Sequence, residues 1–320
     1  MTLPLLARLR RKLQGEPAAA PVNLAAAETP ASPAAGARVV IDRAATLSAE
    51  FPAEFSLAED AATRVLTATA GVDLAPLARR SPALLGYDWT AYLRCSVARV
   101  VRVQRALAAH VPPGGRVLDF GSYFGNFALA CRAMGYEVDA VDAYAEYGDA
   151  LAPCVALQRE SGIRVHDFAE AGHALTAFGA AFDAVVCAGV IEHIPHTPRQ
   201  LLGTIDALLK RGGVLILDTP NLAYLYRRLA LLDGQTIFSP IAGQFYTQLP
   251  FEGHHREYTT AEIEWMLRAI GHTVLAIETF NYSVFGQLEL VGEHLAYQRE
   301  MAGDPALREI IFAVSRRPHD

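Results

Sequence analysis

The stretch VLDFGSYFGN at positions 117–126 contains the clearest structural signal in the chain. A short apolar run leads into a glycine turn and then a helical pattern, which predicts a buried strand that enters a helix. Gly121 lacks a Cβ and readily adopts a positive φ, so a ligand can approach the backbone closely here. In open α/β sheets, ligands bind beyond the carboxyl ends of the strands. We therefore expect Gly121, Ser122 and Gly125 to line a ligand site.

Acidic residues mark the ends of the next two predicted strands. EVDAVD ends at Asp142, 23 residues after Asp119, where a carboxylate is placed to accept hydrogen bonds from ribose hydroxyls. GIRVHD ends at Asp167, followed by Phe168, which together offer an acceptor for an exocyclic amine and an apolar face for a base. A strand-terminal Asp is also a common helix cap. In this order, however, the residues favour a nucleoside ligand.

Two classes of nucleoside cofactor fit this pattern. A dinucleotide site usually shows G-x-G-x-x-G, whose close glycines hold a pyrophosphate at a helix start. This chain instead spaces Gly121 and Gly125 four apart and places Asp119 just before them. A carboxylate there would repel a pyrophosphate but suits a ligand that carries an ammonium and a sulfonium group. The spacing therefore favours S-adenosyl-L-methionine over NAD.

Short apolar runs alternate with helical patterns from residue 116 onward, which predicts an α/β fold with a parallel sheet flanked by helices. Gly135 marks the end of one helix, and Gly271 ends another. That second helix begins at Thr259, which has the spacing of a capping box with Glu262. We expect a binding domain over residues 111–320.

Three segments precede this domain. Residues 1–15 combine leucines with Arg8, Arg10, Arg11 and Lys12 as a short basic amphipathic segment, which could contact an anionic membrane, dock on the protein or fray. Residues 16–37 are rich in Ala and Pro, which predicts a disordered linker. Residues 38–110 have helical patterns, including a helix over 89–110, and we interpret them as a helical N-terminal extension.

Composition restricts the class of protein. The 320 residues include 28 basic and 34 acidic side chains, a net charge of −6, and 52% are hydrophobic. This mild acidity argues against binding to nucleic acid, which needs clustered Lys and Arg. No apolar run approaches the ~20 residues that span a bilayer. The four cysteines have no paired spacing and are expected to be core thiols in a reducing compartment. They are Cys95, Cys131, Cys154 and Cys187. We therefore expect a cytoplasmic protein, or one peripheral at the inner membrane surface.

The motifs together resemble the class I S-adenosylmethionine-dependent methyltransferases, in particular the bacterial small-molecule group that includes ubiquinone-biosynthesis O-methyltransferases. The resemblance covers residues 116–317 and rests first on the motif at 117–125 and on Asp142 and Asp167. It rests further on later motifs: FDAVV at 182–186 followed by VIEHIPH at 190–196, GGVL at 212–215 followed by TPN at 219–221, and HREYT at 255–259. It implies a Rossmann-like seven-stranded, mostly parallel sheet with helices on both faces. The last strand, at about 309–314, would run antiparallel.

This chain departs from the family pattern at three places. Tyr123 stands where the first motif usually has glycine, so its side chain must point outward or over the ligand. Ubiquinone-type members hold a metal with Glu-x-x-Glu-His, but Gly189 replaces the first Glu and leaves Glu192 and His193. We therefore predict no metal. The stretch 281–307 is longer than a hairpin and predicts an extra helix over 286–300.

His193, just past the fourth strand of the family's sheet, is the leading candidate for a catalytic base, because histidine titrates near working pH. Its alternative role is to brace the loop, and His196, His254 and His255 are further candidates. On the acceptor side, the aromatic-rich segment 235–253 is either a lid or a packed loop. Tyr92 and Arg94 are placed either to reach the cofactor carboxylate or to serve core and surface roles.

The sequence thus predicts methyl transfer from S-adenosylmethionine to a small-molecule or lipid- or sugar-linked acceptor. Oxygen is the preferred nucleophile by analogy with the O-methyltransferases. Two alternatives stay open: an NAD(P)-dependent oxidoreductase on a similar sheet, and a module that binds S-adenosylmethionine without catalysis.

Overall fold

The computed structural model describes residues 39–40, 43–78, 86–168, 175–195, 197–238, 241–247, 251, 253–282, 289–290 and 292–319. The basic segment 1–15, the Ala/Pro segment 16–37 and His196 lie outside the described residues. No helix within the described ranges is long and apolar enough to cross a membrane.

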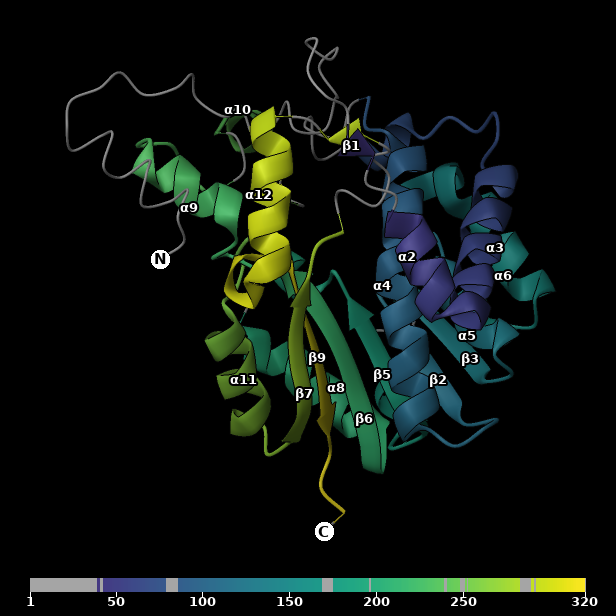
Figure 1. Ribbon diagram of the computed structural model, residues 1–320. Coiled ribbons are helices and arrows are strands. Elements are labelled where there is room, and N and C mark those ends of the chain that lie inside the picture. The colour runs from purple at the N-terminus through teal and green to yellow at the C-terminus, as the bar shows by residue number, and fades with distance from the viewer. Residues whose placement is uncertain are drawn as a thin grey trace, which may run out of the picture.

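A seven-stranded sheet forms the centre of the molecule, in the order β4-β3-β2-β5-β6-β9-β7 (Figure 1). β9 is antiparallel to both of its neighbours, β6 and β7, and the other pairs are parallel. The mostly parallel sheet with an antiparallel last strand is therefore confirmed. The strands are β2 (Arg116–Phe120), β3 (Glu137–Asp142), β4 (Arg164–Asp167), β5 (Phe182–Ala188), β6 (Leu209–Pro220), β7 (Thr273–Phe280) and β9 (Ile310–Arg316).

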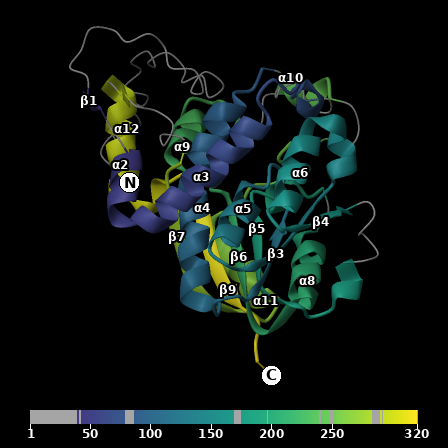
Figure 2. The ribbon, with the colours of Figure 1, turned by 90° about the vertical axis from the view of Figure 1, so that its right-hand side faces the viewer.

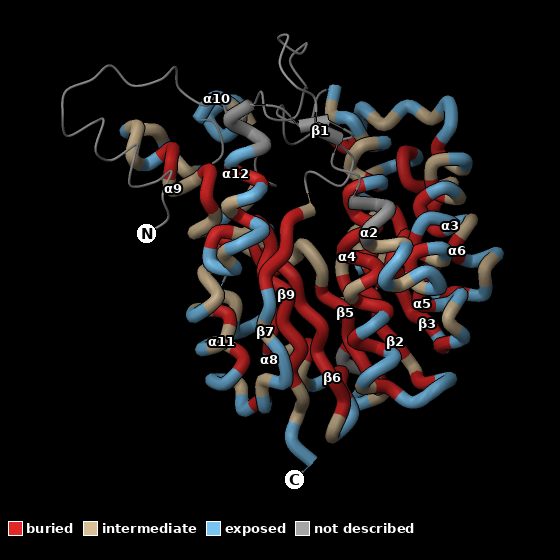
Figure 3. The backbone as a smooth tube through the Cα atoms, viewed as in Figure 1, coloured by how far each residue is buried: buried red, intermediate tan, exposed pale blue. Residues whose placement is uncertain are grey.

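Helices cover both faces of the sheet (Figure 2). Alternate strand residues supply two separate cores, since successive side chains point to opposite faces. Val117 belongs to the core formed with α3, α4, α5 and α6, and Leu118 to the core formed with α8 and α11. Figure 3 shows the buried sheet between these layers. The helices are α3 (Pro52–Ala68), α4 (Trp89–His110), α5 (Asn126–Ala133), α6 (Ala152–Glu160), α8 (Pro198–Leu208) and α11 (Thr260–Ala269).

Local chemistry explains where the main helices begin. The Asp88 side chain accepts a hydrogen bond from the backbone N–H of Ala91 and caps α4. Thr259 and Glu262 form the predicted capping box of α11. α5 starts directly after Gly125, which has φ 80° and so lets the chain turn sharply out of β2.

The chain before α4 is mostly helical. β1 (Val39–Val40) is followed by α2 (Arg43–Glu50), α3 and the short η2 (Ala75–Ala78), and β1 pairs antiparallel with β8 (Glu289–Leu290). All four cysteines are buried and free, which confirms that they are core thiols.

Several short elements lie around the ends of the strands. α9 (Leu225–Leu232), α10 (Ile241–Phe245) and α12 (Gly292–Gly303) lie beyond the end at which the parallel strands finish (Figure 1). The extra helix predicted over 286–300 is present as α12, but it begins at Gly292 and runs to Gly303; positions 283–288 and 291 lie outside the described residues. The remaining short helices are η4 (Tyr144–Leu151), η5 (Leu175–Phe178), η6 (Ile191–His193) and η7 (Pro305–Leu307).

Candidate functional site

Three acidic residues lie at or next to the carboxyl ends of adjacent strands: Asp142 and Asp167 are the last residues of β3 and β4, and Asp119 is the last but one of β2. Asp142 of β3 lies opposite Asp167 of β4 in the parallel register, and Asp119 of β2 lies opposite Ala140. The predicted carboxylates are therefore brought together by the sheet. Because parallel strands finish at the same end of the sheet, these carboxylates lie where ligands bind in open α/β folds.

The Asp142 carboxylate is fixed by three donors. Its Oδ2 accepts from the Tyr123 N–H at 2.7 Å, and its Oδ1 accepts from the Ala143 N–H at 2.7 Å and from the Tyr147 hydroxyl at 3.2 Å. Burial raises the pKa of Asp142 despite these hydrogen bonds. An ionised carboxylate has about four acceptor positions, so at least one remains for a ligand.

The turn after β2 alternates left-handed backbone positions at Gly121 (φ 79°), Tyr123 (φ 48°) and Gly125 (φ 80°). A Cβ on Gly121 would lie 2.3 Å from Cγ2 of Val190, so only glycine fits. Tyr123 is the single non-glycine residue with positive φ among those that the structure describes. Its ring packs edge-on against Phe124 and Tyr147, with centroids 4.6 and 5.2 Å away. The side chain is thus directed sideways into an aromatic cluster.

Asp119 and Ser122, on either side of Gly121, make hydrogen bonds that hold this turn in place. Asp119 is 2% exposed and its Oδ2 accepts from the Ala128 N–H at 3.1 Å. Burial raises the pKa of Asp119 to about 7, with the charge of Asp142 acting in the same direction. The Ser122 hydroxyl donates to Oε1 of Gln158 at 3.4 Å. The Asp119 carboxyl therefore lies next to the backbone turn, where a cationic ligand would favour its ionised form.

At the edge of the site, Asp167 accepts from the Ala145 N–H through Oδ2 at 2.5 Å. Phe168 is 43% exposed, and its ring stands edge-on to Phe120 with centroids 6.2 Å apart. An exposed ring next to a carboxylate suits a flat polar ligand such as a nucleobase.

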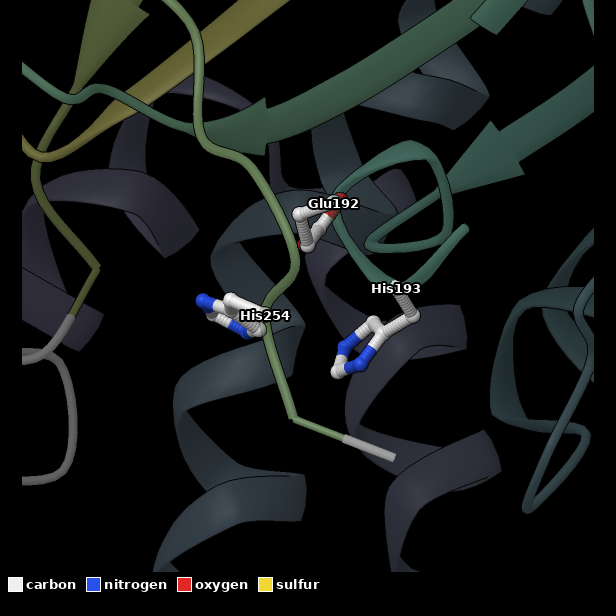
Figure 4. A group of neighbouring side chains, drawn as sticks. All are labelled: Glu192, His193 and His254. Atoms are coloured by element: carbon white, nitrogen blue, oxygen red, sulfur yellow. The ribbon is translucent and has the colours of Figure 1, made fainter. Parts of the chain in front are cut away.

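A second group of side chains lies past the end of β5. Glu192, His193 and His254 each place one donor atom within 4.8 Å of the others, and Figure 4 shows them gathered from two separate segments. The rings of His193 and His254 are edge-on, with centroids 4.6 Å apart. The backbone N–H of His255 donates to the Glu192 carbonyl at 2.8 Å and ties the two segments together. This spacing would accommodate a small cation, and it brings two imidazoles and a carboxyl close enough for each to affect the charge of the others.

Glu192 is 2% exposed and accepts from the Thr219 hydroxyl at 3.0 Å. Burial raises the pKa of Glu192 to about 7, although His254 and Arg99 nearby oppose the shift. His193 is exposed and His254 is half-buried, whereas His255 is exposed and contacts the Phe251 carbonyl.

Sequence reasoning missed the buried ion pair of Arg99 and Asp218. Nε and Nη2 of Arg99 donate to the two oxygens of Asp218, and both side chains are nearly inaccessible. A Cβ on Gly189 would lie 2.8 Å from Nη2 of Arg99, so the glycine makes room for the guanidinium. An arginine within the apolar stretch at 97–101 of α4 was the signal that could have found it. Arg94, the residue chosen from the sequence, is exposed.

Three of the four aromatic rings of the segment 235–253 are exposed, and the fourth, Phe251, is half-buried. Phe238 is 68% exposed, and Phe245 and Tyr246 are each 74% exposed. The interpretation of this segment as a packed loop is therefore wrong for these three side chains. Positions 239–240, 248–250 and 252 lie outside the described residues.

Comparison with known proteins agrees with this geometry. A family described as "Methyltransferase domain" matches residues 89–277, more than half of the chain. The chain belongs to this family and is a class I S-adenosylmethionine-dependent methyltransferase with a Rossmann-like fold. Its methyl donor is S-adenosylmethionine, which decides against the nicotinamide alternative. The glycine turn, the buried Asp119 and the acceptor position left on Asp142 are compatible with that cofactor.

Curated relatives include ubiquinone biosynthesis O-methyltransferases. That of Xanthomonas axonopodis pv. citri is 35% identical over 123 residues, which cover 38% of this chain and 49% of the relative. That of Xylella fastidiosa (strain M23) is 33% identical over 126 residues, which cover 39% and 49%. The chain thus spans about half the length of the curated relatives that it matches.

Among solved structures, a putative sarcosine dimethylglycine methyltransferase from Galdieria sulphuraria aligns with 12% identity and a TM-score of 0.47, over 81% of this chain and 99% of that one. An S-adenosylmethionine-dependent methyltransferase from Mesorhizobium loti aligns with 18% identity and a TM-score of 0.43, over 67% and 96%.

Proposed function

We propose that this chain transfers the methyl group of S-adenosylmethionine to a hydroxyl group of a small molecule or of a lipid- or sugar-linked acceptor. The observation that carries the proposal is the row of carboxylates at the ends of β2, β3 and β4 beside the glycine turn. The choice of oxygen follows the partial relatives, which are O-methyltransferases.

On the cofactor side, we assign Asp142 to the ribose hydroxyls, Asp167 to the exocyclic amine and Phe168 to the face of the adenine. Gly121, Ser122 and Gly125 would shape the backbone cradle, and Asp119 would balance the positive charge of the ligand. Arg99, whose Nη2 lies beside Gly189 just past β5, replaces the exposed Arg94 as a candidate to bind the cofactor carboxylate.

The bound cofactor supplies an electrophilic methyl group, so the protein mainly has to align the acceptor and receive its proton. Alignment of two reactants contributes up to ~7–11 kcal/mol to lowering a barrier. The histidines past β5 are the candidates for the proton, and His193 is the one that the sequence favoured. The exposed aromatics Phe238, Phe245 and Tyr246 would lie against the acceptor.

Thermal shift measurements test the cofactor assignment. S-adenosylmethionine and S-adenosylhomocysteine should both raise the melting temperature, and NAD should not. Deuteromethyl-labelled S-adenosylmethionine with a panel of catechol, methyl glucoside and aniline then tests the acceptor class by mass spectrometry. A labelled aniline with unlabelled hydroxyl compounds would refute the choice of oxygen.

Peripheral membrane contact through residues 1–15 is a separate proposal. Liposomes that contain anionic lipid should sediment the full chain more than a chain without residues 1–15. Equal partitioning would refute it.

A further inference from the structure

His254 is held in one orientation by a buried carboxylate. Its Nδ1 lies 2.6 Å from Oε1 of Glu257, three residues further on, and Glu257 is 7% exposed. At this distance the Nδ1–H donates to the carboxylate, and in the neutral ring the lone pair is then on Nε2. Within the described part of the chain, no hydrogen-bond partner is found for Nε2.

Arg227 of α9 keeps Glu257 ionised. Its Nη2 lies 2.5 Å from the same Oε1, and its Nη1 donates to the Ile237 carbonyl at 2.7 Å. Burial by itself would raise the pKa of Glu257, but the hydrogen bond from His254 and the charge of Arg227 outweigh burial and lower it. The carboxylate therefore stays negative and fixes the imidazole ring.

The pair lies beside the loop that follows β5. The His254 ring contacts His193 edge-on, and Glu192 lies within 4.8 Å of both. The backbone bond from His255 N–H to the Glu192 carbonyl holds the 254–257 segment at this strand end. A ligand over the β5 end would therefore meet His254 as well as His193, although 61 positions separate them.

We propose that His254 accepts the acceptor's proton during methyl transfer and that Glu257 is its positioning residue. This inference rests on the proposed function. The acceptor oxygen forms a bond to the methyl carbon while the carbon–sulfur bond breaks and the sulfur keeps its electron pair. The oxygen's proton moves to Nε2 of His254, and the imidazolium that forms is stabilised by Glu257.

The geometry favours His254 over His193 for this role. His254 is half-buried and its Nδ1 is committed to Glu257, so a single nitrogen is presented in a fixed direction. His193 is exposed. Burial alone would lower the pKa of His254, but the hydrogen bond to Glu257 and the charge of Glu192 outweigh burial and the repulsion of Arg227, and raise it.

The first experiment needs no acceptor. Protein labelled with carbon-13 and nitrogen-15 at histidine, with S-adenosylhomocysteine bound, is followed by NMR between about pH 5 and pH 9. The His254 signals are identified by their loss in His254→Asn. Wild-type neutral His254 should carry its proton on Nδ1, and Glu257→Gln should lower its pKa by about 1–2 pH units. A proton on Nε2 in the wild type, or an unchanged pKa in Glu257→Gln, would overturn the pairing.

The second experiment measures turnover with the hydroxyl acceptor from the panel above. His254→Asn should lower kcat at least ~100-fold. Glu257→Gln should lower kcat about 10-fold with KM unchanged, and the acidic limb of the pH profile should move to lower pH, because a base with a lower pKa is already neutral there. The matched controls, His319→Asn and Glu264→Gln, remove an exposed imidazole and an exposed carboxylate and should retain wild-type turnover.

Each remaining outcome decides the matter. If His254→Asn binds S-adenosylhomocysteine and turns over normally, the proton-acceptor role is wrong while the proposed function stands. If the wild type methylates no hydroxyl compound in the panel, the proposed function fails and the role of His254 fails with it. If Zn²⁺ or Mg²⁺ binds the wild type but not His254→Asn and is required for turnover, the cluster holds a cation instead of a proton. If Glu257→Gln does not fold, the tautomer observed in the wild type still tests the pairing.

Discussion

Replacement of Asp142 by alanine should weaken cofactor binding by a predictable amount. Three of about four acceptor positions on this carboxylate are occupied by the Tyr123 N–H, the Ala143 N–H and the Tyr147 hydroxyl. At least one charge-assisted hydrogen bond to a ribose hydroxyl is therefore available. Such a bond contributes about 1.5–3 kcal/mol, so the Kd for S-adenosylhomocysteine should rise about 10- to 150-fold in Asp142→Ala.

Isothermal titration calorimetry measures this change directly. Tyr147→Phe removes one competing donor, leaves the carboxylate in place, and should change the Kd by less than about threefold. Asp183→Ala is the matched control: Asp183 lies near the start of β5, where it accepts from Lys210, and its loss should leave the Kd unchanged. A Kd for folded Asp142→Ala within about threefold of wild type would refute the ribose assignment.

Three further changes test the fold and the turn. Asp139 has no exposed side-chain area and pairs with two arginines and a histidine. Burial opposes its ionisation, but these partners lower its pKa to about 2. Asp139→Asn should therefore lower the free energy of unfolding in urea by about 2 kcal/mol above pH 4, and this difference from wild type should disappear as pH falls from 3.8 towards about 2. Equal stabilities at neutral pH would contradict this. Gly121→Ala should cost about 1–3 kcal/mol and abolish the thermal shift with S-adenosylhomocysteine, because its Cβ would meet Val190, whereas Gly114→Ala, with similar φ and open space, should retain the shift. Thr259→Ala should cost about 1 kcal/mol by thermal unfolding, and a weaker cofactor affinity would show that the cap does more than stabilise α11.

The cofactor half of the site could be predicted from the sequence because it is local. Asp119, Gly121 and Gly125 lie within one strand, turn and helix, and periodicity alone places them at the strand end. Asp142 and Asp167 follow from the rule that parallel strands finish at the same edge, which the register of β3 and β4 confirms. Buried strands with alternating cores leave little freedom in how such residues can be arranged.

The acceptor half could not be predicted in the same way. The approach of His254 to His193 depends on a backbone bond between two loops, and periodicity does not encode the path of a loop. Arg99 was missed because a charged residue on a long helix is usually solvated. It is stable inside because Asp218, near the end of β6, pairs with it and Gly189 leaves space for it.

This difference between the two halves has a functional consequence. The three carboxylates proposed to meet the cofactor, Asp119, Asp142 and Asp167, are built into β2, β3 and β4, where a change of side chain also disturbs a core or a strand register. The residues proposed to meet the acceptor come from the loop after β5, from the 254–257 segment and from the exposed aromatics at 238–246, none of which belongs to a strand of the central sheet. Substitutions in these segments can therefore change the acceptor while the methyl donor stays the same. The acceptor is accordingly best sought by varying Phe238, Phe245 and Tyr246, whose side chains are exposed and carry little of the stability of the fold.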